Sequence, residues 1–160
     1  MTVSLIDRLD SDIELAEKLE RIVKRAFGNS CAVSNLHLAT LGGSNRTILF
    51  DAIEHSTIRK LVLRTSSVPS RFTPFLSVAL QFQVLNVVWK FGLPVPEPML
   101  LLSKGDGLGE GYVMSAVEGE TSPKSILNGP EFECARGKII AQSAEILAKL
   151  HSLPTDEFSF

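Results

Sequence analysis

The chain has 160 residues, a formal net charge of −2 and 44% hydrophobic residues, which suits a single folded domain. It contains no block of lysine and arginine, so it lacks the electrostatic footprint of a nucleic-acid-binding protein. No apolar run is long enough to cross a membrane, and the first residues lack the pattern of a secretion signal. Cys31 and Cys134 match no metal-binding spacing, and we interpret them as reduced thiols of a cytoplasmic protein.

The first part of the chain predicts one helix followed by short strands. Ser11 and Glu14 form a capping-box pattern, apolar residues then recur at helical spacing, and Gly28 supplies the stop. Short apolar runs at strand spacing follow at Leu36–Leu38, Ile48–Phe50 and Leu61–Leu63. Strands in such quick succession predict an antiparallel meander.

The second part predicts a helix, a hairpin and a final helix. The segment Pro74–Phe91 is apolar nearly all round, which predicts a helix buried on several faces. The runs Met99–Leu102 and Tyr112–Val117, joined by a glycine turn, predict a hairpin. A last helix follows Gly129 and Pro130, with one apolar stripe at Phe132, Ile139, Ser143, Leu147 and Leu150.

The glycine turn before the second strand is the first candidate site. Gly42 and Gly43 permit positive φ and let backbone amides approach an anion closely. Ser44 and Asn45 add side-chain hydrogen bonds to the same turn. The turn therefore indicates a phosphate cradle, although an ordinary hairpin turn has the same composition.

Arg64 closes the third strand and is the second candidate. Strand alternation places Lys60, Val62 and Arg64 on one face, with Leu61 and Leu63 on the other. If the leucines face the core, Val62 and Arg64 face the space below the glycine turn. In the Val-Ala-Ile-Lys strand of kinases, the apolar residue two places before the cation covers the base, and the cation binds the phosphates. A solvated arginine at a strand end is the alternative.

The end of the strand Tyr112–Ser115 is the third candidate. The backbone groups of Ser115 and Val117 follow the apolar run and would be free to pair with an adenine edge. Met114 would be a flexible apolar wall behind them. An ordinary inner strand is the alternative. No histidine, cysteine or carboxylate pattern marks a metal site or a nucleophile.

Taken in order, these segments resemble the aminoglycoside phosphotransferase and choline kinase-like family. The matching segments are Leu41–Thr47, Leu61–Arg64, Gly92–Pro98, Gly111–Gly119 and Ile146–His151. The resemblance implies an α+β fold, a protein-kinase-like N-lobe with a five-stranded antiparallel sheet, a packed helix and an N-terminal helix. Residues 1–117 would form this lobe, and residues 118–160 the hinge and the first helices of an incomplete C-lobe.

The resemblance also implies an ATP site. Residues 42–45 would cover the phosphates and Arg64 would bind them, while Ile48, Val62 and Met114 would line the base pocket. The Ser115 carbonyl and the Val117 amide would form the hinge contacts to adenine.

One residue departs from the family's pattern. The family usually has a glutamate in the N-lobe helix that pairs with the phosphate-binding cation, and the matching position here is Gln81. A neutral amide can still accept a hydrogen bond from Arg64, but the charge pairing is lost.

The family's catalytic loop and metal-binding aspartate should follow His151, and this sequence has neither. We therefore expect the N-terminal ATP-binding portion of a small-molecule kinase that phosphorylates a hydroxyl. The chain would be inactive alone, and magnesium would bind only with the missing C-lobe. The alternative is a non-catalytic relic of a kinase lobe, which dimerises or binds a partner through the apolar helix Phe75–Trp89. The same helix face would equally fit the missing lobe.

Overall fold

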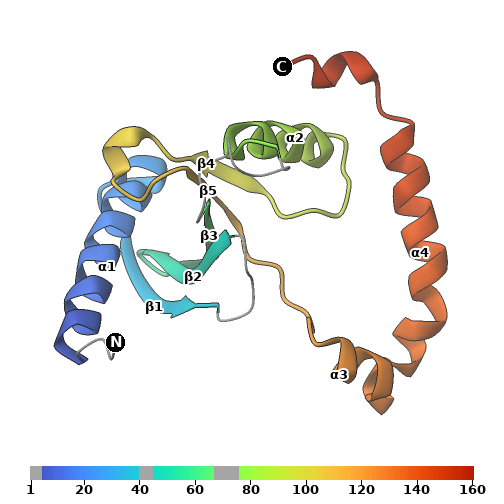
Figure 1. Cartoon of the computed structure of the whole chain (residues 1–160), viewed down its shortest axis with the longest axis horizontal. Coiled ribbons are helices and arrows are strands. Elements are labelled where there is room, and N and C mark those ends of the chain that lie inside the picture. Colours follow the sequence, from blue (N-terminus) through green and yellow to red (C-terminus); the bar gives the residue numbers. More distant parts are fainter. Residues whose placement is uncertain (1–4, 40–44, 67–75) are drawn as a thin grey trace.

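A computed structural model describes residues 5–39, 45–66 and 76–160, and within them the chain forms a five-stranded antiparallel sheet flanked by helices (Figure 1). The sheet order is β1-β2-β3-β5-β4. This arrangement confirms the α+β class and the antiparallel sheet that the resemblance implied. The strands are β1 (Ala32–Leu38), β2 (Asn45–Glu54), β3 (Thr57–Ser66), β4 (Pro98–Leu101) and β5 (Gly111–Ser115).

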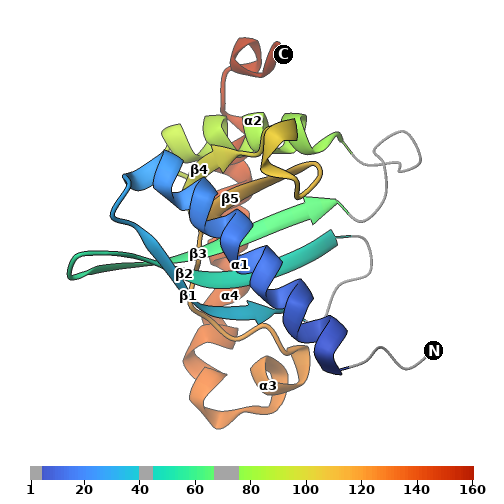
Figure 2. The ribbon, with the colours of Figure 1, turned by 90° about the vertical axis from the view of Figure 1, so that its left-hand side faces the viewer.

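The helices lie on both sides of this sheet. The helix α1 covers one face, and α4 stands on the opposite side, as the two views at right angles show (Figures 1 and 2). No helix in the described part of the chain is long and apolar enough to cross a membrane. The helices are α1 (Leu5–Phe27), α2 (Val78–Lys90), α3 (Pro123–Asn128) and α4 (Glu133–His151), with short 3-10 turns at Lys104–Asp106, Pro130–Phe132 and Thr155–Phe158.

The helix α1 begins earlier than the sequence predicted. It starts at Leu5, so Ser11 and Glu14 lie inside the helix, and the interpretation of these residues as a capping box is wrong. A cap needs a non-helical backbone at its first residue, whereas the residues before Ser11 include no glycine or proline to interrupt the helix. The predicted end is confirmed, because Gly28 has a φ of +118° and its amide donates to the Lys24 carbonyl.

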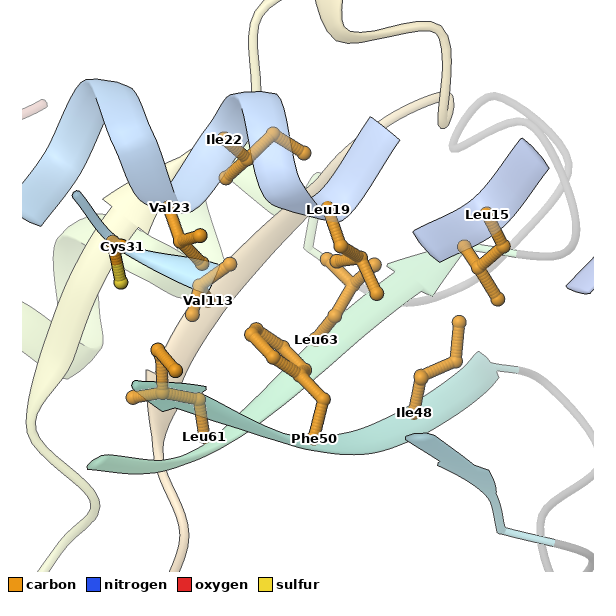
Figure 3. Close-up of a cluster of buried hydrophobic side chains, with 11 residues drawn as sticks. Leu15, Leu19, Ile22, Val23, Cys31, Ile48, Phe50, Leu61, Leu63 and Val113 are labelled. Carbon is orange, nitrogen blue, oxygen red and sulfur yellow. The ribbon is translucent and has the colours of Figure 1, made fainter. Parts of the chain in front are cut away.

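The hydrophobic core lies between α1 and one face of the sheet (Figure 3). Apolar residues at helical spacing in α1 meet alternate residues of the strands. Full burial of each large side chain contributes roughly 1.5–3 kcal/mol. The core residues are Leu15, Leu19, Ile22 and Val23 of α1, Cys31 beside β1, and Ile48, Phe50, Ala52, Leu61, Leu63 and Val113 of the sheet.

One ion pair fastens α1 to the turn between β4 and β5. The carboxylate of Asp106, which is 6% exposed, accepts hydrogen bonds from the two terminal guanidinium nitrogens of Arg25, Nη1 and Nη2, at 2.5 and 3.0 Å. It also accepts from the amide and the hydroxyl of Ser103, at 2.6 and 3.0 Å. The bonds from Arg25 and Ser103 outweigh the opposing effect of burial and lower the pKa of Asp106 to about 2.

The helix α2 packs at the β4–β5 side of the sheet. Ser77 caps its start by accepting a hydrogen bond from the Leu80 amide at 3.3 Å. The Phe82 ring lies 5.7 Å from the ring of Tyr112 in β5. Val78, Val87 and Val88 are buried, but Trp89 is 41% exposed, so α2 is less completely covered than its apolar sequence predicted. Residues 74 and 75 of the predicted helix lie outside the described residues.

The helix α4 stands apart from the sheet. Near its start, Arg136 donates to two backbone carbonyls at the end of α3, and near its C-terminal end the helix contacts the end of α2. The ammonium of Lys149 donates to the Gly92 carbonyl, just beyond α2, at 2.8 Å. A cation at this position complements the negative end of the α2 dipole. The predicted apolar stripe of α4 faces outward instead of being buried, since Ile139 is 49% and Leu147 is 50% exposed.

Candidate functional site

The sheet face opposite α1 carries the predicted residues of β3. Leu61 and Leu63 are buried in the core, and strand alternation therefore directs Lys60, Val62 and Arg64 to the other face. The strand register adds neighbours to this face: Leu49 and Met114 flank Val62, and Thr47 and Tyr112 flank Arg64. We call these residues, Thr47, Leu49, Lys60, Val62, Arg64, Tyr112 and Met114, the site face.

Ile48 does not belong to the site face, which corrects the prediction that it lines a base pocket with Val62. Its side chain is 1% exposed and points toward α1, and its register partner is Leu63 (Figure 3). Leu49, which is 41% exposed, occupies the position beside Val62. The sequence reasoning missed Leu49 because the run Ile48–Phe50 is apolar throughout and its alternation is therefore ambiguous.

A cavity of about 400 Å³ opens at the end of the site face where β5 ends. Its size falls within the range of small-molecule sites, roughly 300–1,000 Å³. Val117, a predicted hinge residue, lines it. The remaining lining residues are Asn35 and His37 of β1, Leu49, Phe50 and Asp51 of β2, Lys60 and Leu61 of β3, and Ala116, Glu118 and Gly119 after β5.

The backbone at the end of β5 is hydrogen-bonded on both of its sides, and Val117 follows directly after these contacts. The Ser115 amide donates to the Glu97 carbonyl at 2.9 Å, and the Ser115 hydroxyl accepts from the Glu97 amide at 2.8 Å. The Ala116 amide donates to the Lys60 carbonyl at 2.9 Å. The Val117 amide donates no hydrogen bond to another described residue, and its side chain is 71% exposed. This donor at the cavity is therefore available to a ligand.

Charged groups surround the same end of the cavity. The Lys60 ammonium lies 2.5 Å from a carboxylate oxygen of Glu118, and this bond raises the pKa of Lys60 and lowers the pKa of Glu118. Asn35 has a left-handed φ of 50° where the β1–β2 register shifts, and its side-chain amide donates to Asp51 at 2.6 Å. No sequence motif marked these residues, because they lie far apart in the sequence and only the strand register brings them together.

The remaining predicted residues are placed as follows. The side-chain nitrogen of Gln81 donates to the Leu76 carbonyl at 2.7 Å, at the start of its own helix. The bond predicted between its oxygen and Arg64 stays a prediction. Asn45 begins β2 opposite Ser66, and residues 42–44 lie outside the described residues. Within the part of the chain that the structure describes, no group of three histidine, cysteine, aspartate or glutamate residues is arranged to hold a metal ion.

Comparison with protein families identifies the chain. The model of the phosphotransferase enzyme family, APH, matches residues 37–160, well over half of the chain. The chain belongs to the phosphotransferase enzyme family. The match confirms the resemblance drawn from the sequence. It includes β3, β5 and every lining residue of the cavity except Asn35, which lies with the rest of the first 36 residues outside it. No curated protein matches the sequence.

Proposed function

We propose that this phosphotransferase-family chain binds ATP on its site face and serves an enzyme that transfers phosphate to a hydroxyl of a small molecule. The observation that carries the proposal is the cavity beside Val117, where an unbonded backbone donor meets apolar residues of the sheet. The base is assigned to this cavity, which Leu49 lines on the sheet side. Val62 and Met114, which were predicted to line the base pocket, follow Leu49 across the strand register and are not among the lining residues. A flat aromatic ring pairs well with such a site, because its faces are apolar and its edge forms hydrogen bonds.

We assign the phosphates to the opposite end of β3. Two residues of a strand advance about 6–7 Å, so Arg64 lies one such step beyond Val62, away from the cavity. The guanidinium of Arg64 is always charged and suits the bidentate binding of phosphate oxygens. We place the triphosphate beside Arg64. The turn 42–45, which the sequence predicts as a phosphate cradle, lies outside the described residues except for Asn45.

Bound ATP would supply the phosphoryl group. The residues of this chain would orient it, since phosphoryl transfer depends mainly on positioning and on stabilisation of negative charge. The Val117 amide would fix the base, and Arg64 would hold the phosphate oxygens. Magnesium would accompany the nucleotide, and we assign none of its ligands to the described residues. The two free thiols, Cys31 and Cys134, fit the cytoplasm, where ATP is used.

Nucleotide titration followed by protein NMR tests the proposal. MgATP should shift the amide signals of Val117, Lys60 and Leu49, with a dissociation constant near 1 mM, or about −4 kcal/mol. Adenosine should shift the same three signals, because these residues line the base cavity, and leave the signal of Arg64 unchanged. Arg64→Met should weaken ATP binding and leave adenosine binding unchanged, with Arg21→Met, at an exposed position of α1, as the matched control. The proposal is wrong if MgATP leaves the Val117 region unshifted at about ten times that concentration.

A non-catalytic role in partner binding is the second candidate, and the exposure of apolar side chains on α4 favours it. Ile139, Ile140 and Leu147 are 49%, 81% and 50% exposed. An apolar surface of this kind often marks a contact with another protein. Sedimentation velocity over a concentration series separates the candidates, because a tight dimer that binds no ATP would favour this role over the nucleotide site.

A further inference from the structure

Lys60 contacts the chain on both sides of Val117. Its carbonyl accepts the Ala116 amide at 2.9 Å, and its ammonium pairs with Glu118 at 2.5 Å. The first contact extends the ladder between β3 and β5 by one step. The second reaches past Val117 to the next residue, so one residue of β3 fixes the two neighbours of the candidate base-binding amide.

Little else in the described chain supports this segment. A Cβ placed on Gly119 would meet no atom within 4 Å, and the Val117 side chain is 71% exposed. Packing therefore does not determine where residues 117–119 lie. The contacts of Lys60 do so, together with the Ser115–Glu97 bonds at the end of β5.

Asp51 is the competing partner for the Lys60 ammonium. The two residues are paired across β2 and β3, and the charge of Asp51 also raises the pKa of Lys60. However, Asn35 donates to Asp51 at 2.6 Å from the irregular position in β1. This bond satisfies one oxygen of Asp51 and favours the pairing of Lys60 with Glu118.

We propose that Lys60 is a positioning residue for base recognition. It holds residues 116 and 118 so that the Val117 amide is presented to the cavity. It thereby sets the affinity for the base and not the affinity for the triphosphate. This inference rests on the proposed nucleotide function. It assigns to Lys60 a role that differs from that of Arg64, two positions further along the same strand.

Both side chains of the pair are exposed, at 62% and 80%, so the expected effect is small. Loss of the pair should weaken adenosine and ATP binding about two- to five-fold. The probes are adenosine, MgATP and inorganic tripolyphosphate, titrated into the full chain and followed by NMR. The variants are Lys60→Met, Glu118→Gln and the charge exchange Lys60→Glu with Glu118→Lys. Lys104→Met, in the exposed turn before β5, is the control.

Positioning and simple charge predict different patterns. If Lys60 positions the hinge, Lys60→Met and Glu118→Gln both weaken adenosine binding, neither changes tripolyphosphate binding by more than about two-fold, and the charge exchange restores adenosine binding. If Lys60 acts only through its charge, the two single variants shift tripolyphosphate binding in opposite directions and leave adenosine binding unchanged. That result overturns the inference.

Two further measurements keep the inference separate from the proposed function. Amide hydrogen exchange without ligand should become faster at residues 116–119 in Lys60→Met and Glu118→Gln, and stay unchanged in the core strands. Unchanged exchange at the hinge overturns the positioning role, whatever the nucleotide results. Wild-type protein that binds none of the three probes overturns the nucleotide function and the inference together, whereas normal adenosine binding by Lys60→Met overturns the inference alone.

Discussion

Replacement of Asp106 by asparagine should remove most of the attachment between α1 and the β4–β5 turn. The carboxylate is 6% exposed and accepts four hydrogen bonds, two from Arg25 and two from Ser103. Asparagine has nearly the same shape but no charge, and it presents one acceptor oxygen instead of two. The substitution therefore tests the charge and the bonding of this group without opening a cavity.

The expected magnitude follows from the lowered pKa. A pKa of about 2 in the folded protein, against an ordinary value of 3.8, corresponds to about 2 kcal/mol of stability when the carboxylate is ionised. Because the pKa is lowered on folding, this stabilisation is fully present above pH 3.8 and is lost as the pH falls toward 2. At neutral pH, Asp106→Asn should lower the free energy of unfolding by about 2 kcal/mol.

Urea unfolding at pH 7 and over a series from pH 5 to pH 2 measures both effects. The difference between wild type and Asp106→Asn should stay constant down to about pH 4, shrink below that pH and nearly vanish near pH 2. Arg25→Met should lose part of the same energy, since Arg25 is 45% exposed and the Ser103 bonds remain. Asp156→Asn, an exposed carboxylate near the last turn, is the control and should change stability by less than about 0.5 kcal/mol. A loss below this limit for Asp106→Asn at pH 7 would refute the reasoning.

Other predictions concern the two sheet faces and two backbone positions. Ile48→Ala should cost about 2–5 kcal/mol of unfolding free energy, whereas Leu49→Ala should cost far less and weaken ATP binding. Chemical unfolding measures the stability and NMR titration the binding, and the reverse pattern would contradict the assignment of faces. Gly111→Ala should cost about 1–3 kcal/mol in thermal unfolding, because its Cβ would lie 2.7 Å from the Arg64 carbonyl oxygen, while Gly119→Ala, with open space, is the control. Lys149→Met should remove about 0.3–1 kcal/mol by uncapping α2, seen as faster amide exchange in its last turn; equal exchange would show that the Gly92 bond contributes nothing.

The order and type of the elements could be predicted from local sequence signals. The shift from helical to alternating apolar spacing located α1 and the first strands, and Gly28 marked the end of α1 because its backbone has a positive φ. The face of β3 was also predictable. Leu61 and Leu63 alternate there with Lys60, Val62 and Arg64. If one leucine lies in the core, the other lies there too, and the remaining three residues lie on the opposite face.

The cavity could not be predicted in the same way, because it depends on register and on a strand irregularity. Asn35, Asp51 and Lys60 lie in three separate strands, and only their pairing brings them to one end of the sheet. The apolar run Ile48–Phe50 fits either face, so Leu49 could not be distinguished from Ile48 until the register was known. The contact between Arg25 and Asp106 joins residues 81 positions apart and left no local signal.

The core of this protein and the segment that identifies its family have different limits. The family match begins at residue 37, after α1 and most of β1, yet α1 provides four of the side chains that cover Phe50, Leu63 and Val113. A polypeptide cut at the start of the family match would leave one whole face of the sheet in contact with water. Exposed apolar strands of this kind are prone to aggregation. Soluble expression of the family domain therefore depends on a helix that carries no part of the family signature.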